Sequence, residues 1–364
     1  MEIKKIVITG GPCAGKTTAL SWIQNKITAL GYTVLFVPET ATELITGGVA
    51  PWTCGTNLDY QMIQMELQLY KEKAFERAAS TMPKDKILVV CDRGAMDNRA
   101  YMTEEEFKQV QKAIGKTEVE LRDSYDAVFH MVSAANGAID FYTTENNLAR
   151  HESPEDAIDL DNRLIAAWTG HPHFRVINNS TSFETKLKNL IKEITSFLGT
   201  TVPLEMKRKF LIEYPDIEWL ESLPYCHKVE IKQTYLLAPE GEEVRIRKRG
   251  ENGSYLFFLK SKKPKTATER IVIEKRLRKG EYEMLLNQAD PKLNPIRKTR
   301  YCLTWHSRYY EVDVYPFWKD RAIMEIELNS ADEVVDIPDG LKVIRDVTEE
   351  AEYKNVSLAR KIPA

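Results

Sequence analysis

One short segment constrains the fold of this chain more than any other. Residues 10–17 read Gly-Gly-Pro-Cys-Ala-Gly-Lys-Thr and fit the pattern GxxxxGK followed by Ser or Thr. An apolar run at 3–9 precedes this segment, and a helical pattern begins at Lys16. Glycines let such a turn curl its backbone N–H groups toward an anion, and the start of the helix adds partial positive charge. The sequence therefore predicts a strand, a phosphate-binding loop and a helix, in that order.

We expect this loop to bind the phosphates of a nucleoside triphosphate, either GTP or ATP. Lys16 is expected to reach the β- and γ-phosphates, and the Thr17 hydroxyl to hold Mg²⁺. The alternative is a glycine-rich turn that binds nothing, and the complete pattern in its strand-to-helix context disfavours it. The predicted nucleotide-binding residues are Gly10, Gly11, Pro12, Cys13, Ala14, Gly15, Lys16, Thr17 and Thr18.

Carboxylates follow two other predicted strands of the same half. The apolar run 87–91 ends in Asp92, and Glu39 comes shortly after the run 33–37. Asp92 is a candidate ligand of Mg²⁺ or a candidate base, and Glu39 is a candidate base for a substrate hydroxyl. For Glu39 the alternative is an exposed residue at a strand end with no role. The Asn-Lys-x-Asp tetrapeptide by which many GTPases read their base does not occur in the sequence.

A phosphoryl group in transfer needs cations around it, and arginines on a lid often supply them. Segment 148–154 precedes a helical pattern and contributes Arg150 as the candidate lid residue. The alternative is a solvated start of a helix, in which Arg150 pairs with Glu152 or Asp156. The candidate catalytic residues of this half are Lys16, Glu39, Asp92 and Arg150.

The periodicity of the sequence changes near residue 200. Up to that point short apolar runs alternate with helical patterns, which predicts a parallel sheet with helices on both faces. Beyond it most segments have strand composition and period-two alternation, which predicts an antiparallel sheet closed or nearly closed into a barrel. We therefore predict an α/β nucleotide-binding domain at 1–198, a linker at 199–203 and an α+β domain with an antiparallel β-barrel at 204–364.

Charge and cysteine content exclude several classes of protein. The chain has 51 Lys and Arg against 54 Asp and Glu, a net charge of −3, which favours no nucleic-acid partner. Five scattered cysteines without a CxxC pair favour a reducing compartment over a disulfide framework or a zinc site. With neither a signal peptide nor a run of about 18 apolar residues, we expect a cytoplasmic protein with at most peripheral membrane contact. The oligomeric state stays open.

Basic residues recur two apart along the predicted strands of the second half, for example at Arg245, Arg247 and Arg249. Alternate residues of a strand share one face. A single strand of this kind has a solvent face, whereas several together predict a barrel interior lined with cations. The candidate anion-binding residues are Lys207, Lys209, Arg245, Arg247, Arg249, Lys260, Lys298 and Arg300.

Acidic residues lie on the same strands and are candidate ligands of a second divalent metal. An interior with both kinds of charge suits a polyphosphate together with a divalent metal, since Arg and Lys clamp oxygens and carboxylates hold Mg²⁺ or Mn²⁺. The candidate metal ligands of the chain are Thr17, Asp92, Glu205, Glu274, Asp313, Glu325 and Glu327.

The first half resembles the P-loop ATPase/kinase-like domain shared by bacterial nicotinamide-riboside kinase modules and the TRPL translocation defect protein family. The shared motifs are Gly10-Gly11-Pro12-x-x-Gly15-Lys16-Thr17-Thr18, Pro38-Glu39-Thr40 and Asp92-Arg93-Gly94-x-x-Asp97. The second half resembles the CYTH, or triphosphate tunnel metalloenzyme, superfamily. Its matching segments are Glu205-x-x-x-Lys209, Arg245-x-Arg247, Lys298-Thr299-Arg300-Tyr301, Glu311-Val312-Asp313-Val314-Tyr315 and Glu325-Ile326-Glu327-Leu328.

The order of the two halves matches the TRPL translocation defect protein family. That resemblance implies GTP binding, and binding of phosphoinositide or phosphatidic acid in membrane trafficking. The CYTH superfamily opens with Glu-x-Glu-x-Lys, and Lys207 stands here in place of the second acid. The replacement removes a metal ligand and adds a cation, which weakens the case for metal-dependent hydrolysis of triphosphates.

Three functions follow from these observations. The first is a regulatory protein whose P-loop domain binds and slowly hydrolyses a nucleoside triphosphate and whose barrel binds an anionic phosphorylated ligand, a lipid headgroup or another phosphorylated small molecule. The second is a kinase that transfers the γ-phosphate to a nucleoside or another small molecule at a pocket near Tyr60, Gln61 and Arg93. The third is a metal-dependent tunnel-type triphosphatase. We favour the first, followed by the second.

Overall fold

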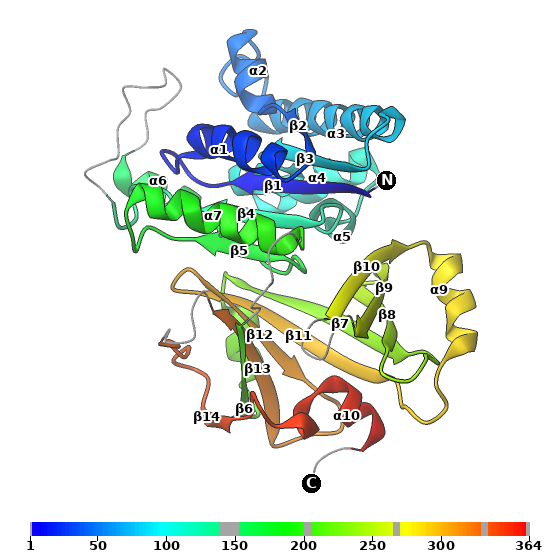
Figure 1. Ribbon diagram of the computed structural model, residues 1–364. Helices are drawn as coiled ribbons and strands as arrows, with labels where there is room; N and C mark the ends of the chain where they lie inside the picture. Colours follow the sequence, from blue (N-terminus) through cyan, green and yellow to red (C-terminus); the bar gives the residue numbers. More distant parts are fainter. Residues whose placement is uncertain (1, 139–152, 200–205, 265–269, 329–333, 362–364) are drawn as a thin grey trace. The chain divides into compact units, whose positions relative to one another are not determined.

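The computed structural model describes residues 2–138, 153–199, 206–264, 270–328 and 334–361 (Figure 1). The chain divides into two compact units: Met1–Leu204 with His306–Arg308, and Glu205–Trp305 with Tyr309–Ala364. Most of the predicted linker, and both Arg150 and Glu205, lie outside the described residues. Among the helices in the described ranges, none combines the length and the apolar character that a bilayer crossing requires.

A parallel sheet forms the centre of the first unit, as the sequence predicts. Its five strands run in the order β2-β3-β1-β4-β5. They are β1 (Glu2–Thr9), β2 (Thr33–Val37), β3 (Lys86–Asp92), β4 (Ala127–Met131) and β5 (Phe174–Ile177). Because β1 lies between β3 and β4, the loop that follows β1 lies at the carboxyl edge of the sheet between the loops that follow its neighbours. Ligands of open α/β sheets bind at this edge.

Helices α1 (Lys16–Ala29) and α7 (Phe183–Phe197) cover one face of this sheet (Figure 1). Their apolar side chains form one core with residues of β1, β3 and β4. On the other face α3 meets β1, because the buried Lys5 side chain pairs there with Glu72. The remaining helices of the unit are α2 (Thr40–Thr46), α3 (Asn57–Thr81), η1 (Ala95–Tyr101), α4 (Glu104–Ile114), α5 (Glu118–Arg122) and α6 (Pro154–Trp168).

Short polar side chains set where several of these helices begin. Thr56 accepts a hydrogen bond from the N–H of Asp59 at the start of α3. Ser153 caps α6, and Asp156 completes a capping box there. This contact engages the Asp156 carboxylate with Ser153, so one of the two acids that we weighed as partners of Arg150 already has a local role.

A nine-stranded sheet forms the second unit, in the order β10-β9-β8-β7-β11-β12-β13-β6-β14. The registers that the structure gives are antiparallel, as predicted. The strands are β6 (Met206–Glu213), β7 (Cys226–Tyr235), β8 (Glu243–Glu251), β9 (Ser254–Pro264), β10 (Arg270–Leu277), β11 (Ile296–Trp305), β12 (Arg308–Val314), β13 (Arg321–Leu328) and β14 (Val343–Asp346).

Closure of this sheet into a barrel is not found among the described strands. The strand order ends at β10 on one side and at β14 on the other, with no pairing between them. Strand β14 is four residues long, is exposed along its length and shifts register between Val343 and Arg345. A short edge strand with a bulge offers no continuous row of backbone groups to a further strand. Of the expected barrel, closed or nearly closed, the antiparallel sheet is therefore found, and its closure is not found among the described strands.

The apolar side chains of the second unit gather in separate clusters, the largest around β11, β12 and β13. A second cluster joins the sheet to η4 and α10, and a third lies under α9. The helices of this unit are α8 (Ile217–Ser222), α9 (Lys279–Leu285), η3 (Leu286–Gln288), η4 (Ala351–Tyr353) and α10 (Asn355–Arg360).

Candidate functional site

The segment between β1 and α1 has the backbone of a phosphate-binding loop. Gly10, Cys13 and Gly15 have φ angles of 149°, 55° and 89°. A Cβ on Gly10 would lie 2.1 Å from the carbonyl oxygen of Met131, so only glycine fits there. Gly15 is the residue before the first turn of α1, which is where backbone N–H groups have no partner inside the helix. The predicted strand, loop and helix thus lie where the sequence places them.

The side chains of the loop residues differ in their surroundings. Lys16 Nζ donates to the carbonyl oxygen of Gly10 at 3.3 Å, so the lysine bends back over the loop. Burial, and the positive charge of Arg93, lower the pKa of Lys16, while Glu39 and Asp92 oppose this. Thr17 is exposed on the first turn of α1, where its hydroxyl can reach a ligand.

Asp161 of α6 holds the loop from behind, and sequence reasoning did not identify it. Its Oδ1 accepts from the N–H of Gly11 at 2.7 Å, and its Oδ2 accepts from the N–H of Ser133 at 3.1 Å. His130 Nε2 lies 3.1 Å from the same carboxylate. Burial would raise the pKa of Asp161, but His130 and these N–H donors lower it. An acid within the buried stripe of an amphipathic helix was the signal that could have found it.

Asp92 ends β3 beside Ile8 of β1, next to the start of the loop. Its Oδ1 is buried and has no hydrogen-bond partner within the described part of the chain. Burial raises the pKa of Asp92, and Glu39 adds to the rise, while the charge of Lys16 opposes it. A buried carboxylate oxygen without a donor is costly, unless a ligand or a metal ion completes it.

Glu39, Arg93 and Asp97 form a connected group next to Asp92. Arg93, with a φ of 67°, donates its Nε–H to Glu39 Oε1 and lies 3.5 Å from Asp97 Oδ1. Thr42 donates to the other oxygen of Glu39 at 2.6 Å. Burial would raise the pKa of Glu39, but Arg93 and Lys16 outweigh it and lower the pKa to about 2. Glu39 is therefore a half-buried, ionised partner of Arg93 rather than a solvated strand end.

Asp97 positions this group instead of reacting. It accepts hydrogen bonds from the Thr9 hydroxyl, from the N–H of Gly94 at 2.7 Å and from Trp168 Nε1 at 3.3 Å. Its oxygens are thus occupied by donors from the end of β1, the start of η1 and α6. The contacts fix the two strand ends that carry the phosphate loop and Asp92.

In the second unit the predicted cations face acids across neighbouring strands. Lys207 pairs with Glu327 at 2.5 Å, and Lys209 with Glu325 at 2.9 Å, as the register of β6 and β13 requires. The face continues to β12, because Glu311 lies opposite Glu325. Lys207, which stands where the CYTH superfamily has an acid, therefore contacts Glu327, one of the candidate metal ligands.

The pairs continue over the rest of the sheet. Asp313 is fully buried and accepts from Lys298 and from Arg300 Nε, the latter at 2.7 Å. Glu274 lies 3.1 Å from Arg247 and 3.0 Å from Lys260. Burial would raise the pKa of Glu274, but these two cations lower it to about 2. Arg245 lies 3.6 Å from Glu243, and Arg249 is buried on the same strand.

The candidate metal ligands of this unit are thus separated into ion pairs. Glu274, Asp313, Glu325 and Glu327 each contact at least one cation. Within the described residues of the unit, no three Asp, Glu, His or Cys ligand atoms converge at metal-binding spacing.

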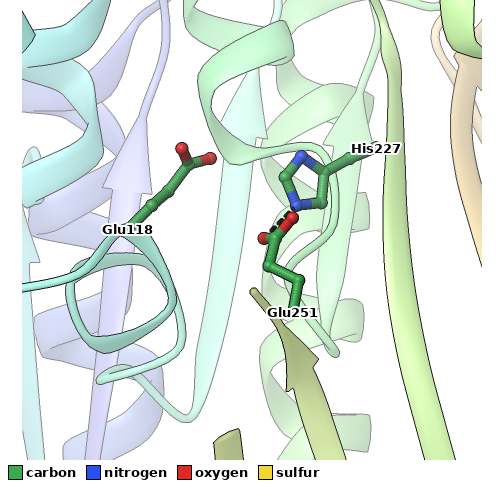
Figure 2. Close-up of side chains that lie close together, drawn as sticks. All are labelled: Glu118, His227 and Glu251. Atoms are coloured by element: carbon green, nitrogen blue, oxygen red, sulfur yellow. Dashed lines mark hydrogen bonds and ion pairs between the residues drawn. The ribbon is translucent and has the colours of Figure 1, made fainter. Parts of the chain in front are cut away.

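Figure 2 shows a further charged contact of this unit, between His227 of β7 and Glu251 of β8, whose Nε2 and Oε1 atoms lie 2.6 Å apart. Sequence reasoning did not identify this pair. Glu118, drawn in the same figure, belongs to the first unit, where it accepts from Arg99 NH1 at 2.7 Å. Each carboxylate is explained by a partner within its own unit.

The chain was compared with known proteins. A family model described as an AAA domain matches residues 5–186. No curated protein matches the chain. Among the solved structures to which the chain is similar is the inorganic triphosphatase NE1496, with 27% identity over 44% of this chain and 98% of that chain and a TM-score of 0.32. Another is deoxyadenosine kinase from M. mycoides with bound dATP, with 15% identity over 53% of this chain and 99% of that chain and a TM-score of 0.38. The PH1012 protein from Pyrococcus horikoshii OT3 has 14% identity over 34% of this chain and 80% of that chain and a TM-score of 0.25. The family match and the phosphate loop make the first unit a nucleotide-binding domain of the NTPase or kinase kind.

Proposed function

Because the chain belongs to the AAA domain family, we propose that its first unit binds a nucleoside triphosphate, GTP or ATP, together with Mg²⁺ and slowly hydrolyses it. One observation carries this proposal. A phosphate loop braced by Asp161 lies beside the half-buried Asp92, whose Oδ1 is buried and has no hydrogen-bond partner among the described residues. Mg²⁺ prefers oxygen ligands, so the Asp92 carboxylate and the Thr17 hydroxyl are the residues that would hold it. The ion would neutralise charge on the phosphates.

The residues around the loop have separate parts in this reaction. Phosphate oxygens draw Lys16 away from the Gly10 carbonyl, and their charge favours its protonated form. The loop N–H groups and Lys16 then stabilise charge that develops on the transferring group. Glu39, with a pKa of about 2 and its bond to Arg93, is a weak base and an effective orienting acceptor. A loose transition state needs orientation more than proton removal.

For the second unit we propose binding of a phosphorylated anion, either a polyphosphate or the headgroup of an anionic lipid such as a phosphoinositide or phosphatidic acid. We call the side of the sheet that carries Lys207, Lys209, Arg245, Arg247, Lys260, Lys298 and Arg300 the charged face. Its cations contact carboxylates, so phosphate oxygens would replace carboxylate oxygens as their acceptors. Arginine suits this exchange because its planar fork binds phosphate at two points. A regulatory role in membrane trafficking would couple this binding to the nucleotide state.

A second candidate function is a small-molecule kinase, and one observation favours it. Tyr60 Oη, Gln61 Oε1 and Asn98 Oδ1 are buried without a hydrogen-bond partner within the described chain. Burial, and the charge of Glu39, raise the pKa of Tyr60 to about 12, which places the tyrosine within electrostatic reach of Glu39. An acceptor with a hydroxyl and several polar groups, such as a nucleoside, would satisfy these atoms.

The third candidate, a metal-dependent triphosphatase in the second unit, has less support. Its acids contact cations, and Lys207 occupies one of them, Glu327. Hydrolysis would require a metal ion to displace several ammonium or guanidinium groups at once.

Labelled nucleotide separates the three candidates. The protein is incubated with Mg²⁺ and γ-labelled ATP or GTP, with and without a pool of nucleosides. We expect slow release of phosphate that is lost in Lys16→Ala and kept in Lys26→Ala, an exposed lysine of the same helix. Stoichiometric label on a nucleoside would establish the kinase instead. Release that survives Lys16→Ala but is lost in Glu325→Ala would place the chemistry in the second unit.

The anion-binding proposal is tested with tripolyphosphate and with vesicles of phosphatidylcholine containing phosphatidic acid. Arg245→Glu with Arg247→Glu should abolish binding to whichever of the two is the ligand, while nucleotide affinity holds. The matched control is Lys232→Glu with Arg297→Glu, two residues that lie opposite each other on neighbouring strands and on the other face. Equal losses in both double variants, or no loss in either, would refute a specific anion site on the charged face.

A further inference from the structure

Lys186 is a buried lysine of the first unit that lies directly behind the phosphate loop. It belongs to the first turn of α7, and 3% of it is exposed. Its Nζ donates to the carbonyl oxygen of Ala14 at 3.2 Å, to that of Val132 at 2.6 Å and to Asn179 Oδ1 at 2.7 Å. One side chain thereby joins the loop, the end of β4 and the loop after β5.

All three acceptors are neutral oxygens, so these contacts solvate the ammonium without cancelling its charge. Asn179 is itself fixed, because its Nδ2 donates to the carbonyl oxygens of Ser133 and Asn136, both at 2.7 Å. A buried charge is costly unless something compensates it. The acid that acts on Lys186 electrostatically is Asp161, and its carboxylate is already shared by Gly11, Ser133 and His130.

The contact with Ala14 also orients the loop. In a planar trans peptide the C=O of one residue and the N–H of the next point in opposite directions. Lys186 holds the Ala14 carbonyl toward the protein interior, so the N–H of Gly15 points away from it. Ser133 Oγ does the same for the preceding turn, since it donates to the Pro12 carbonyl at 2.5 Å. The two contacts turn the N–H groups of Cys13 and Gly15 toward the concave side of the loop, where phosphate would bind.

We propose that Lys186 is a positioning residue for nucleotide binding, whose ammonium both holds the loop in its phosphate-binding shape and supplies a positive charge behind it. The inference rests on the proposed nucleotide-binding function. The loop would then be served by two lysines. Lys16 would contact the phosphates, whereas Lys186 would act through the loop backbone without contacting them.

The proposal predicts a dependence of affinity on pH. Burial lowers the pKa of Lys186 to about 8, against the opposing charge of Asp161. On the elements packed around it, His130 of β4 contacts Asp161, Lys16 begins α1, and Arg175 of β5 pairs with Glu193 of α7; Glu184 and Lys188 of α7 pair with each other. The ammonium is therefore present at neutral pH and lost as the pH rises through that region. A bound polyanion favours the charged form, and one unit of pKa rise on binding corresponds to about a tenfold gain in affinity.

Affinity for Mg²⁺-ATP and Mg²⁺-GTP is measured at about pH 7 and about pH 9.5 in the full chain, in Lys186→Met, in Lys186→Arg and in Lys188→Met. Lys188 is an exposed lysine of the same helix and serves as the matched control. Lys16 is present in all of these proteins, so the ratio of affinities between two of them isolates the effect of Lys186. We expect Lys186→Met to bind about tenfold more weakly near pH 7, with the ratio shrinking toward one near pH 9.5.

Thermal unfolding of each variant is recorded with its affinity. If Lys186→Met does not fold, Lys186→Arg decides, because arginine stays charged over this range and should show a shallower fall of affinity with pH than the full chain. A ratio that is the same at both pH values, or an arginine variant with the pH profile of the full chain, would overturn the inference. Absence of nucleotide binding to the unmodified chain would instead overturn the proposed function.

Discussion

The phosphate-loop site of the first unit and the charged face of the second unit differ in how their charged groups are paired. Among the described residues, some charged groups near the loop lack a charged partner: one oxygen of Asp92 accepts no hydrogen bond, and the hydrogen bonds of Lys16 and Lys186 go to neutral oxygens. In the second unit Lys207, Lys209, Arg247 and Arg300 each contact an acid of another strand. The loop site is therefore incomplete without a ligand, whereas the charged face is complete and must break ion pairs to bind one.

This difference sets what each site can gain from its ligand. A buried polar group without a hydrogen-bond partner has already been desolvated by folding. A ligand that forms the missing hydrogen bond therefore gains most of its free energy. A cation that already contacts a carboxylate contributes less to the free energy of binding, because the new contact with phosphate replaces the old one with carboxylate. We expect nucleotide binding to be the tighter of the two, and anion binding to the charged face to depend more on salt.

The largest expected effect comes from Asp313, the fully buried acid of the charged face. Asp313→Asn leaves Lys298 and Arg300 without their shared carboxylate, and breaking a buried pair in this way costs about 3–5 kcal/mol. Denaturant unfolding of the full chain measures it. Adding Lys298→Met should recover part of the loss, because one of the uncompensated charges is removed. A single variant within about 1 kcal/mol of the full chain would contradict a self-balanced face.

Asp161→Ala is the corresponding test of the loop. It removes the acceptor of the Gly11 and Ser133 N–H groups, and each buried donor left unsatisfied costs about 1–3 kcal/mol. We expect a lower midpoint of thermal unfolding and at least about tenfold weaker nucleotide binding. Asp159→Ala, an exposed acid on the same helix, is the control. Normal nucleotide affinity in Asp161→Ala would show that the loop keeps its shape without this brace.

Glu39 makes the stability of the first unit depend on pH. Its pKa is about 2 in the folded chain and about 4.5 ordinarily, so it stabilises the fold above the ordinary value and loses this contribution as the pH falls toward 2. Because Glu39 is partly exposed, we expect a contribution of about 1–3 kcal/mol. The stability difference between the full chain and Glu39→Gln should shrink between about pH 5 and pH 2. A difference that stays constant with pH would mean that Arg93 does not hold the carboxylate ionised.

The smallest expected effect is that of salt on ligand affinity, and it compares the phosphate loop and the charged face directly. Raising the ionic strength from about 0.05 to 0.5 M shortens the range of electrostatic attraction severalfold. Tripolyphosphate binding to the charged face should weaken more than nucleotide binding to the loop, because the loop also uses backbone N–H groups in a fixed geometry. Titrations of both ligands at the two ionic strengths compare them. Equal losses would remove the distinction between the two sites.

Much of the fold was accessible from periodicity and motif. The alternation of strands and helices predicts the parallel sheet, and the pattern at 10–17 predicts the loop and the strand and helix around it. Period-two alternation predicts the antiparallel sheet of the second unit. Closure was overestimated because alternation reports which face of a strand is polar, and does not report whether the two edge strands of a sheet meet.

The site was less accessible, because its supports come from distant parts of the chain. Asp161 and Lys186 lie 150 and 172 residues along the chain from the loop residues that they contact. In the sequence, each of the two is an ordinary charged residue of an amphipathic helix. Only the structure shows that each is buried. Similarly, Lys207 was seen to replace an acid, but only the register of β6 and β13 reveals its pairing with Glu327.

Calorimetric titration of Mg²⁺-ATP and Mg²⁺-GTP into the full chain, Lys16→Ala and Lys26→Ala tests the central claim most directly. We predict one nucleotide per chain in the full protein and in Lys26→Ala, and a loss of at least about 100-fold in affinity in Lys16→Ala, for which two pKa units of lost interaction are the equivalent. No binding of either nucleotide to the full chain, or equal affinity in all three proteins, would contradict the assignment of the braced loop as the nucleotide site.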